Sequence, residues 1–293
     1  MNRYRSVVSR FTLSKACAVI GMAFVLCVIA AVWSVTGGKD FPRTQFTLKA
    51  IPASAVHHSW QAPRVRNANG TSSNWSGYAV YSDAQSSPGK GKKSASTATF
   101  SYVTGSWVVP GVVASASANT YSSTWVGLDG YSDGTVEQIG TEQDWSNGSA
   151  QYYAWFEMYP KWAYEIVGFP VNPGDTISAD VEYKSKGAFT LTIINVTEDV
   201  SFSITQRSPS AQRLSAEWIE EAPWSGGVLP LADFGTVDFF DCSATMNGST
   251  GTISDDQWQK DAITMETSDG TDKAVPSGLS SGGTSFRVTW YNE

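Results

Sequence analysis

The segment AEWIEEAP, Ala216 to Pro223, places three glutamates within eight residues. A glutamate with an ordinary pKa is partly ionised near pH 4, so it can take a proton from water and later return it. Few other side chains could serve as a base, because the only histidines, His57 and His58, lie far upstream. We therefore ask which of these glutamates does chemistry, and with which partner.

Several common chemistries are excluded by residues that the sequence lacks. A Ser–His–Asp or Cys–His mechanism needs an imidazole base, and both histidines fall in an expected linker. Cys242 is the one cysteine beyond the N-terminal segment, so it cannot supply a thiolate zinc site. The sequence has no GxxxxGK[ST] or GxGxxG motif, and no Asp-Thr-Gly or Asp-Ser-Gly triplet of pepsin-like enzymes. If the protein is a hydrolase, a carboxylate must be the base, and no metal or cofactor is required.

Strand alternation predicts which side chains can meet, because successive residues point to opposite faces. Four segments have faces that combine aromatic, acidic and amide side chains. These faces carry Tyr153, Trp155, Glu157 and Tyr159; Trp125 and Asp129, with Gly127 leaving space between them; Val136, Gln138 and Gly140; and Glu217, Ile219 and Glu221. A core face would bury mostly Val, Leu and Ile. This composition is instead typical of the wet, concave side of a sheet that receives a polymer.

The elements that must position these residues are short strands. Aromatic residues make up 13% of the chain and charged residues only 16%. Alternating runs are separated by glycines and by Asn-Gly or Asp-Gly pairs. The clearest runs are NWSGYAVY, GSWVVP, TWVGLDG, YYAWFEMYP, DTISADVEY, FTLTIINV, VDFFDC and FRVTWY. Many short strands with such punctuation predict an all-β protein, a β-sandwich or barrel of antiparallel sheets.

Charge and hydropathy divide the chain into parts. The net charge is −7, and the first 15 residues carry four cations and no acid, which leaves −11 on the rest. An acidic body argues against nucleic acid as a partner and suits work at low pH. The basic start and the apolar run 16–33 predict that residues 1–37 are a signal peptide or an N-terminal hydrophobic helix that anchors the chain. Either way, the body is exported: it is secreted, or it stays on the outer face of the membrane.

Residues 38–72 are interpreted as a linker or pro-segment, and residues 73–293 as the β-sandwich domain. Basic residues outnumber acidic ones in the segment 38–72. Such a segment could cover the cleft of an acidic domain at neutral pH and leave it as carboxylates protonate. The alternative is a solvated spacer.

The ordered set of segments resembles the glutamic peptidases, the eqolisin family of acid endopeptidases, formerly grouped as A4 acid peptidases. The resembling segments are SNWSGY, TWVGLDG, QIG, QDW, AWFEMYP, PGDTISADV, AEWIEE and VDFFDCSATMNG. The resemblance implies a sandwich of two curved antiparallel sheets, of concanavalin A-like or jelly-roll type, with a catalytic Gln–Glu pair on the concave face. It assigns the pair to Gln138 and Glu221. It also implies a substrate cleft formed by Trp75, Trp125, Asp129, Trp155, Glu157 and Tyr159.

This resemblance also implies a mechanism and a partner. Glu221 takes a proton from a water molecule that attacks the peptide carbonyl, Gln138 holds the water and stabilises the oxyanion, and Glu221 returns the proton to the leaving amine. Glu217 and Glu220 are then flanking residues, and we expect Glu220 to project to the other face, in contact with solvent. We expect a pepstatin-insensitive monomer whose partners are polypeptide substrates.

Two other classes of protein remain open. A carbohydrate-binding module would use the aromatic face to bind sugars without hydrolysis. A glycosidase would need two carboxyls, for which Glu157 and Glu221 could serve. Individual residues also have simpler interpretations: the three tryptophans could be ordinary core, Asp129 could hold a turn, and Asn74 begins a glycosylation sequon beside the expected cleft.

Overall fold

The computed structural model describes residues 46–51, 70–82, 98–114 and 119–293, all within the compact unit Arg43–Glu293. The regular elements in this part of the chain are strands, without an α-helix. They are β1 (Thr47–Ala50), β2 (Gly70–Ser72), β3 (Trp75–Tyr81), β4 (Phe100–Val108), β5 (Ser123–Leu128), β6 (Val136–Ser146), β7 (Ser149–Tyr159), β8 (Tyr164–Val167), β9 (Thr176–Ser185), β10 (Ala188–Asn195), β11 (Val200–Arg207), β12 (Ser215–Glu221), β13 (Thr236–Met246), β14 (Ser249–Thr252), β15 (Gln259–Glu266), β16 (Asp272–Pro276) and β17 (Phe286–Trp290). The predicted all-β fold is confirmed.

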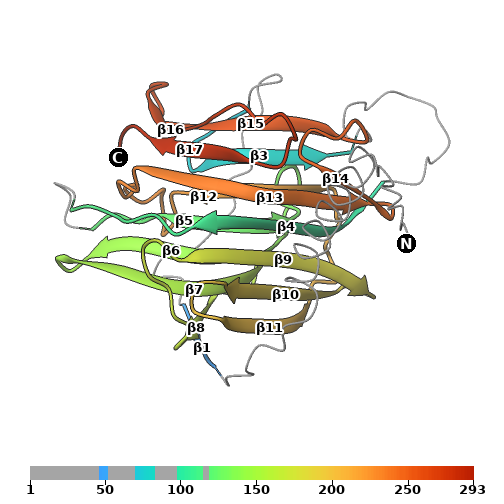
Figure 1. Ribbon diagram of the computed structural model, residues 1–293, viewed down its shortest axis with the longest axis horizontal. Coiled ribbons are helices and arrows are strands. Elements are labelled where there is room, and N and C mark those ends of the chain that lie inside the picture. The colour runs from blue at the N-terminus through green and yellow to red at the C-terminus, as the bar shows by residue number, and fades with distance from the viewer. Residues whose placement is uncertain (1–45, 52–69, 83–97, 115–118) are drawn as a thin grey trace, which may run out of the picture. The chain divides into compact units, whose positions relative to one another are not determined.

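Hydrogen bonds join these strands into one 17-stranded sheet. One run of neighbours goes from β1 through β8, β7, β6, β5, β12 and β3 to β15. A second goes from β16 through β17, β13, β4, β9 and β10 to β11, and the β15–β16 pairing connects the two. Figure 1 shows the strands aligned side by side. The pairings between these strands are antiparallel, except that of β2 with β15. The jelly-roll type and the division into two sheets stay predictions.

The main hydrophobic core takes residues from both runs, including Val126 of β5 and Ile139 of β6 from the first and Val181 of β9 from the second. Trp218 of β12 shows how closely the runs approach. Its indole Nε1 donates a hydrogen bond of 2.8 Å to the carbonyl of Thr104 in β4, although β12 and β4 are not paired. One face of β5, β6 and β12 therefore points into this core, and the other face is free to build a site.

The first two strands lie inside the segment 38–72, which the sequence predicts to be a linker or pro-segment. Strand β1 pairs with β8, the backbone N–H of Ile51 donates to the carbonyl of Ala163 at 2.9 Å, and the Lys49 ammonium lies 2.9 Å from the Glu165 carboxylate. Part of the segment thus extends the sheet. The domain boundaries 1–37, 38–72 and 73–293 stay predictions.

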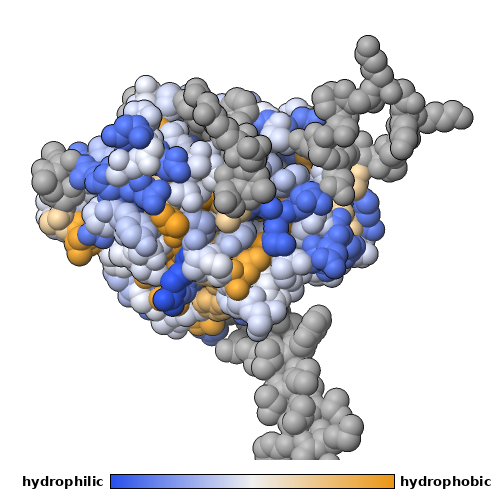
Figure 2. Space-filling model, turned by 90° about the horizontal axis from the view of Figure 1, so that it is seen from above, coloured by the Kyte–Doolittle hydropathy of each residue, from blue (hydrophilic) through white to orange (hydrophobic). Residues whose placement is uncertain are grey.

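Residues 16–33, the expected signal peptide or anchor, lie outside the described residues. Among the residues that the structure does describe, no helix has the length and apolar character needed to cross a membrane. The surface of the β-sheet unit is mixed: Figure 2 shows hydrophobic residues in small patches between hydrophilic ones. The large exposed hydrophobic side chains are scattered, at Leu48, Val108, Val113, Trp162, Val196 and Tyr291.

Candidate active site

The strand register places the expected catalytic residues on one face of the sheet. Gln138 of β6 lies directly opposite Glu157 of β7 and Gly127 of β5. Gly127 in turn lies opposite Glu217 of β12. Directly opposed residues share a face, and so do residues separated by an even number along a strand. Gln138, Glu157 and Glu221 therefore project from the same face, the one turned away from the main core.

Aromatic side chains cover this face. Trp75, Trp125 and Trp155 belong to a second hydrophobic cluster, separate from the main core, with Tyr159 packed at its border. The rings of Trp75 and Trp125 meet edge to face, with centroids 5.0 Å apart. All three tryptophans are buried. They pack among themselves and with small aliphatic residues, so they form a local core around the expected catalytic pair.

Two N–H groups hold the carboxylate of Glu221. The indole Nε1 of Trp125 donates to Oε2 at 2.8 Å, and the amide Nδ2 of Asn74 donates to Oε1 at 3.1 Å. Glu221 is only 1% exposed, so water does little to screen these bonds. Hydrogen bonds of this kind stabilise the ionised form of a buried carboxylate and fix its orientation.

Asn74 is a residue of the candidate site that sequence reasoning missed. It is completely buried, and the hydroxyl of Ser72 donates to its Oδ1 at 3.2 Å, which turns the amide Nδ2 toward Glu221. Its amide is therefore engaged inside the protein instead of being available to a glycan. The only signal in the sequence was its position directly before Trp75, at the start of a strand whose first residue pairs with Glu221.

Within the described part of the chain, a single hydrogen bond holds the side-chain amide of Gln138. Its Nε2 donates to Oε2 of Glu157 at 2.7 Å, and the side chain is buried. Its Oε1 has no hydrogen-bond partner among the described residues. A primary amide carries two N–H donors and a carbonyl acceptor. After its bond to Glu157, Gln138 keeps one N–H and the whole carbonyl oxygen available for a ligand.

The indole of Trp125 connects the two halves of the site. While its Nε1 contacts Glu221, its Cζ3 edge lies over Gly127, 3.0 Å from where a Cβ atom would stand. The Cβ of Gln138 lies 3.2 Å from that same position. One aromatic ring thus extends from the carboxylate of Glu221 to the space over Gly127, which the Cβ of Gln138 borders on the other side. The space predicted at Gly127 is present, and it accommodates this ring edge.

Asp129 lies at the end of the same strand, but its carboxylate is directed elsewhere. Oδ2 accepts backbone N–H bonds from Gln212 and Arg213 at 2.9 and 2.7 Å, and Oδ1 accepts one from Leu214 at 2.6 Å. Burial, followed by the charge of Asp133, raises the pKa of Asp129 to about 7. These contacts fit a residue that holds the chain before β12. A role for Asp129 in binding substrate stays a prediction.

Glu220 projects to the face opposite Glu221, as expected, but the expected solvent contact is wrong. The side chain is completely buried, accepts a 2.6 Å hydrogen bond from the Thr124 hydroxyl, and has a pKa raised well above the usual value by burial. The reason is that β12 is a central strand between β3 and β5, covered on both faces.

Glu217 is completely buried on the side of the catalytic pair, and neither carboxyl oxygen has a hydrogen-bond partner among the described residues. Burial raises the pKa of Glu217 well above its usual value, and the charge of Asp129 adds to this. At acid pH this side chain is therefore a neutral acid beside the site. Within the described ranges, no group of three or more His, Cys, Asp or Glu side chains is placed to hold a metal ion.

The antiparallel sheet and its buried amide–carboxylate site define a class: an all-β protein in which side chains from several strands of one face form the candidate site. Residues 73–290 match the model of the Peptidase A4 family. The chain belongs to this family, so the expected family is confirmed, and its members are hydrolases of peptide bonds.

Named relatives agree. The chain is 31% identical to Aspergillopepsin-2 of Aspergillus niger over 224 residues, 67% of this chain and 74% of that protein. It is 28% identical to Scytalidopepsin B of Scytalidium lignicola, over 77% of this chain and 83% of that protein. Among solved structures, scytalido-glutamic peptidase with a transition state analog inhibitor aligns with a TM-score of 0.60 and 25% identity, over 75% of this chain and 98% of that one. Aspergilloglutamic peptidase from Aspergillus niger aligns with a TM-score of 0.53 and 32% identity, over 59% and 99%.

Proposed function

We propose that the protein is an acid endopeptidase that hydrolyses polypeptides through Gln138, Glu221 and an activated water molecule. One observation carries the proposal: the buried amide and the buried carboxylate project from the same face of the strands that flank β5, and the Trp125 indole of β5 binds the carboxylate and extends over Gly127, opposite Gln138. Family membership supports the same chemistry. The sugar-binding and glycosidase alternatives are not favoured, because they give the Gln138 amide no task.

The reaction follows from the groups that remain available. The Glu221 carboxylate takes a proton from water, while the unpartnered Oε1 of Gln138 accepts the other water hydrogen. The oxygen of the water attacks the peptide carbonyl carbon, and the free N–H of Gln138 donates to the resulting oxyanion. Glu221 then gives its proton to the amide nitrogen, the C–N bond breaks, and the carboxylate is ionised again.

The surroundings favour acid pH. The Gln138 amide is neutral at every working pH. Burial raises the pKa of the adjacent Glu220 carboxyl well above its usual value, and the charge of Glu221 adds to this. Near pH 4 Glu220 is uncharged and does not repel the charge on Glu221. At higher pH it is driven toward ionisation, which adds negative charge close to the site.

Substrate access requires movement. Gln138 and Glu221 are 2% and 1% exposed, so a peptide carbonyl can reach them only when covering groups shift. The partly exposed Tyr153 and Tyr159 border the aromatic cluster and are positioned to contact a bound chain first. We also propose that the body acts as an exported monomer, secreted or held at the outer face of the membrane by residues 16–33.

The proposal is tested with Gln138→Ala and Glu221→Gln, assayed on denatured casein at pH 3–5 in the presence of pepstatin. Each should lower the cleavage rate by about 10²- to 10⁴-fold, as expected for removal of an oxyanion donor or a base, and leave the melting temperature close to that of the parent. Gln257→Ala and Glu198→Gln, both at exposed positions, are the matched controls. Substantial cleavage by Glu221→Gln would refute the assignment, and release of sugars from a polysaccharide panel without proteolysis would favour the alternatives.

A further inference from the structure

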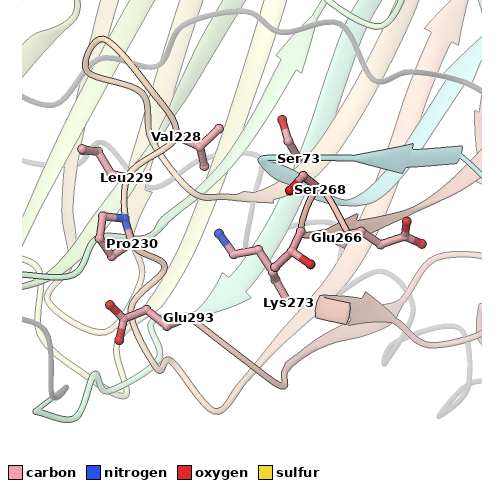
Figure 3. Close-up of a pocket in the computed structure, with 9 residues that line it drawn as sticks. Ser73, Val228, Leu229, Pro230, Glu266, Ser268, Lys273 and Glu293 are labelled. Carbon is pink, nitrogen blue, oxygen red and sulfur yellow. The ribbon is translucent and has the colours of Figure 1, made fainter. Parts of the chain in front are cut away.

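A hollow of about 410 Å³ adjoins the chain segments that carry the Glu221 end of the site. One wall is Ser73, the residue before Asn74. Another is the loop Val228–Pro230, which follows β12 after a short turn. The backbone N–H of Ala222 donates to the carbonyl of Asn74 at 2.8 Å, so the two walls are tied together directly beside Glu221. Figure 3 shows the hollow between this loop and Ser73.

Lys273 of β16 provides the positive charge of this hollow. Its residue is 6% exposed, and it forms no side-chain hydrogen bond or ion pair with the described residues. Figure 3 shows its ammonium directed into the hollow, toward the loop Val228–Pro230. A largely buried lysine is costly unless its charge is compensated, and buried lysines are nearly always in direct contact with a carboxylate. Burial accordingly lowers the pKa of Lys273, against the opposing effect of Glu293.

Two carboxylates also line the hollow, Glu266 and Glu293. In Figure 3 the Glu266 carboxylate points away from the ammonium, whereas the Glu293 carboxylate lies on the loop side of the hollow. Neither forms an ion pair with Lys273 within 4.0 Å. Among the described residues that line the hollow, Lys273 is the one cation, and its ammonium faces the space without a carboxylate in direct contact.

We propose that this hollow is a subsite for a carboxylate of the bound polypeptide, placed on the side of the scissile bond that extends past Glu221. The inference rests on the proposed function. The ammonium and the hydroxyls of Ser73 and Ser268 supply donors for a carboxylate. The apolar loop Val228–Pro230 supplies a surface for the methylene groups that carry it. A glutamate side chain and the C-terminal carboxylate of a peptide share this chemistry.

Cleavage-site mapping by mass spectrometry tests the proposal first. Denatured proteins digested at pH 4.5 should show Asp or Glu enriched at one fixed distance from the cleaved bond. Synthetic peptides then carry Glu or Gln at that position with an amidated C-terminus, and a third carries Gln with a free C-terminus. The kcat/KM of the preferred carboxylate peptide should exceed that of the amidated Gln peptide about tenfold, as expected for a charge-assisted hydrogen bond in a partly open site. The Glu and free-terminus arms show which carboxylate the subsite takes.

The variant Lys273→Met removes the charge and keeps the side-chain length, so it should bring this ratio to about one. Lys273→Arg should retain a preference, and Lys260→Met, at an exposed position on β15, should leave the ratio unchanged. An unchanged ratio in Lys273→Met, or no enrichment of acidic residues at any position, overturns the subsite. If the parent protein cleaves none of the peptides, the proposed function fails instead. The subsite is then tested by measuring the Kd of the carboxylate peptide. Binding about tenfold tighter to the parent than to Lys273→Met supports the subsite, and equal Kd values overturn it.

Discussion

Replacing Trp125 by phenylalanine isolates the contact that joins the two halves of the site. The smaller ring still occupies the aromatic cluster, but the N–H that donates to Oε2 of Glu221 at 2.8 Å is gone. Trp125 and Glu221 are both buried, at 0% and 1% exposure, so bulk water cannot readily replace the lost N–H donor. The bond from Asn74 to the other carboxylate oxygen would remain.

The size of the effect follows from the type of bond. A buried hydrogen bond to a charged group contributes about 1.5–3 kcal/mol, which corresponds to about 10- to 150-fold in rate at 1.4 kcal/mol per factor of ten. Because the lost donor stabilised the ionised carboxylate, Glu221 should hold its proton to higher pH. The loss should therefore be greatest at the acid end of the profile and diminish as the pH rises.

The measurement is kcat/KM on an internally quenched peptide between pH 2.5 and 6. Trp218→Phe is the matched control, because its indole Nε1 also donates a 2.8 Å bond, to the carbonyl of Thr104, but in the main core. Both variants lose the same atoms, and thermal melting reports the stability that each loses. If the two pH profiles coincide, the Trp125–Glu221 bond has no part in catalysis and the reasoning is wrong.

Three further changes test the supporting structure. Gly127→Ala would place a Cβ 3.0 Å from the Trp125 ring and 3.2 Å from the Cβ of Gln138. It should therefore lower the free energy of unfolding by about 1–3 kcal/mol and reduce cleavage. Gly134→Ala, whose Cβ would have no atom within 4 Å, should do neither. Burial raises the pKa of Glu217, so the folded state binds this proton more tightly than the unfolded chain. The free energy of unfolding should therefore fall as the pH rises from about 4 toward 7. Denaturant titrations should show a smaller fall for Glu217→Gln, and an identical fall would contradict a buried, protonated glutamate. Asp129→Asn exchanges one acceptor oxygen for a donor against the backbone N–H groups of residues 212–214. With a pKa of about 7, Asp129 is ionised at pH 8 and protonated at pH 4, so the change should cost about 1–3 kcal/mol of stability at pH 8 and less at pH 4; an unchanged melting temperature at pH 8 would show that these bonds are dispensable.

The sequence alone was sufficient to predict which face of its strand each site residue occupies. It was not sufficient to predict which strands lie side by side in the sheet. Alternation correctly placed Gln138 and Glu157 on equivalent faces of their strands, and Glu220 and Glu221 on opposite ones, because the period of a strand is a local property. It could not show that β5 lies between β6 and β12. Strand order depends on pairings between distant segments, and here it decides that Trp125 stands between amide and carboxylate. The burial of Glu220 was missed for the same reason.

Other features left no local signal. Asn74 acts through its neighbours, and an Asn before a strand is equally consistent with a turn or a glycan site. Strand β1 is exposed along its whole length, so it has no hydrophobic alternation to predict it and is defined by its pairing with β8. The orientation of Lys273 into a hollow likewise depends on the loop after β12, which is distant from it in sequence.

The distribution of the site over several strands determines how the protein should lose activity when it unfolds. Gln138 belongs to β6, Trp125 to β5 and Glu221 to β12, while Asn74 directly precedes β3, so no hairpin or loop contains the reactive set. Activity should therefore disappear together with the cooperative melting of the sheet, without a stage at which a folded body survives with a locally disordered centre. For the same reason, the site cannot be transplanted to another protein as a short peptide graft; the strand order and register of the sheet would have to be moved with it.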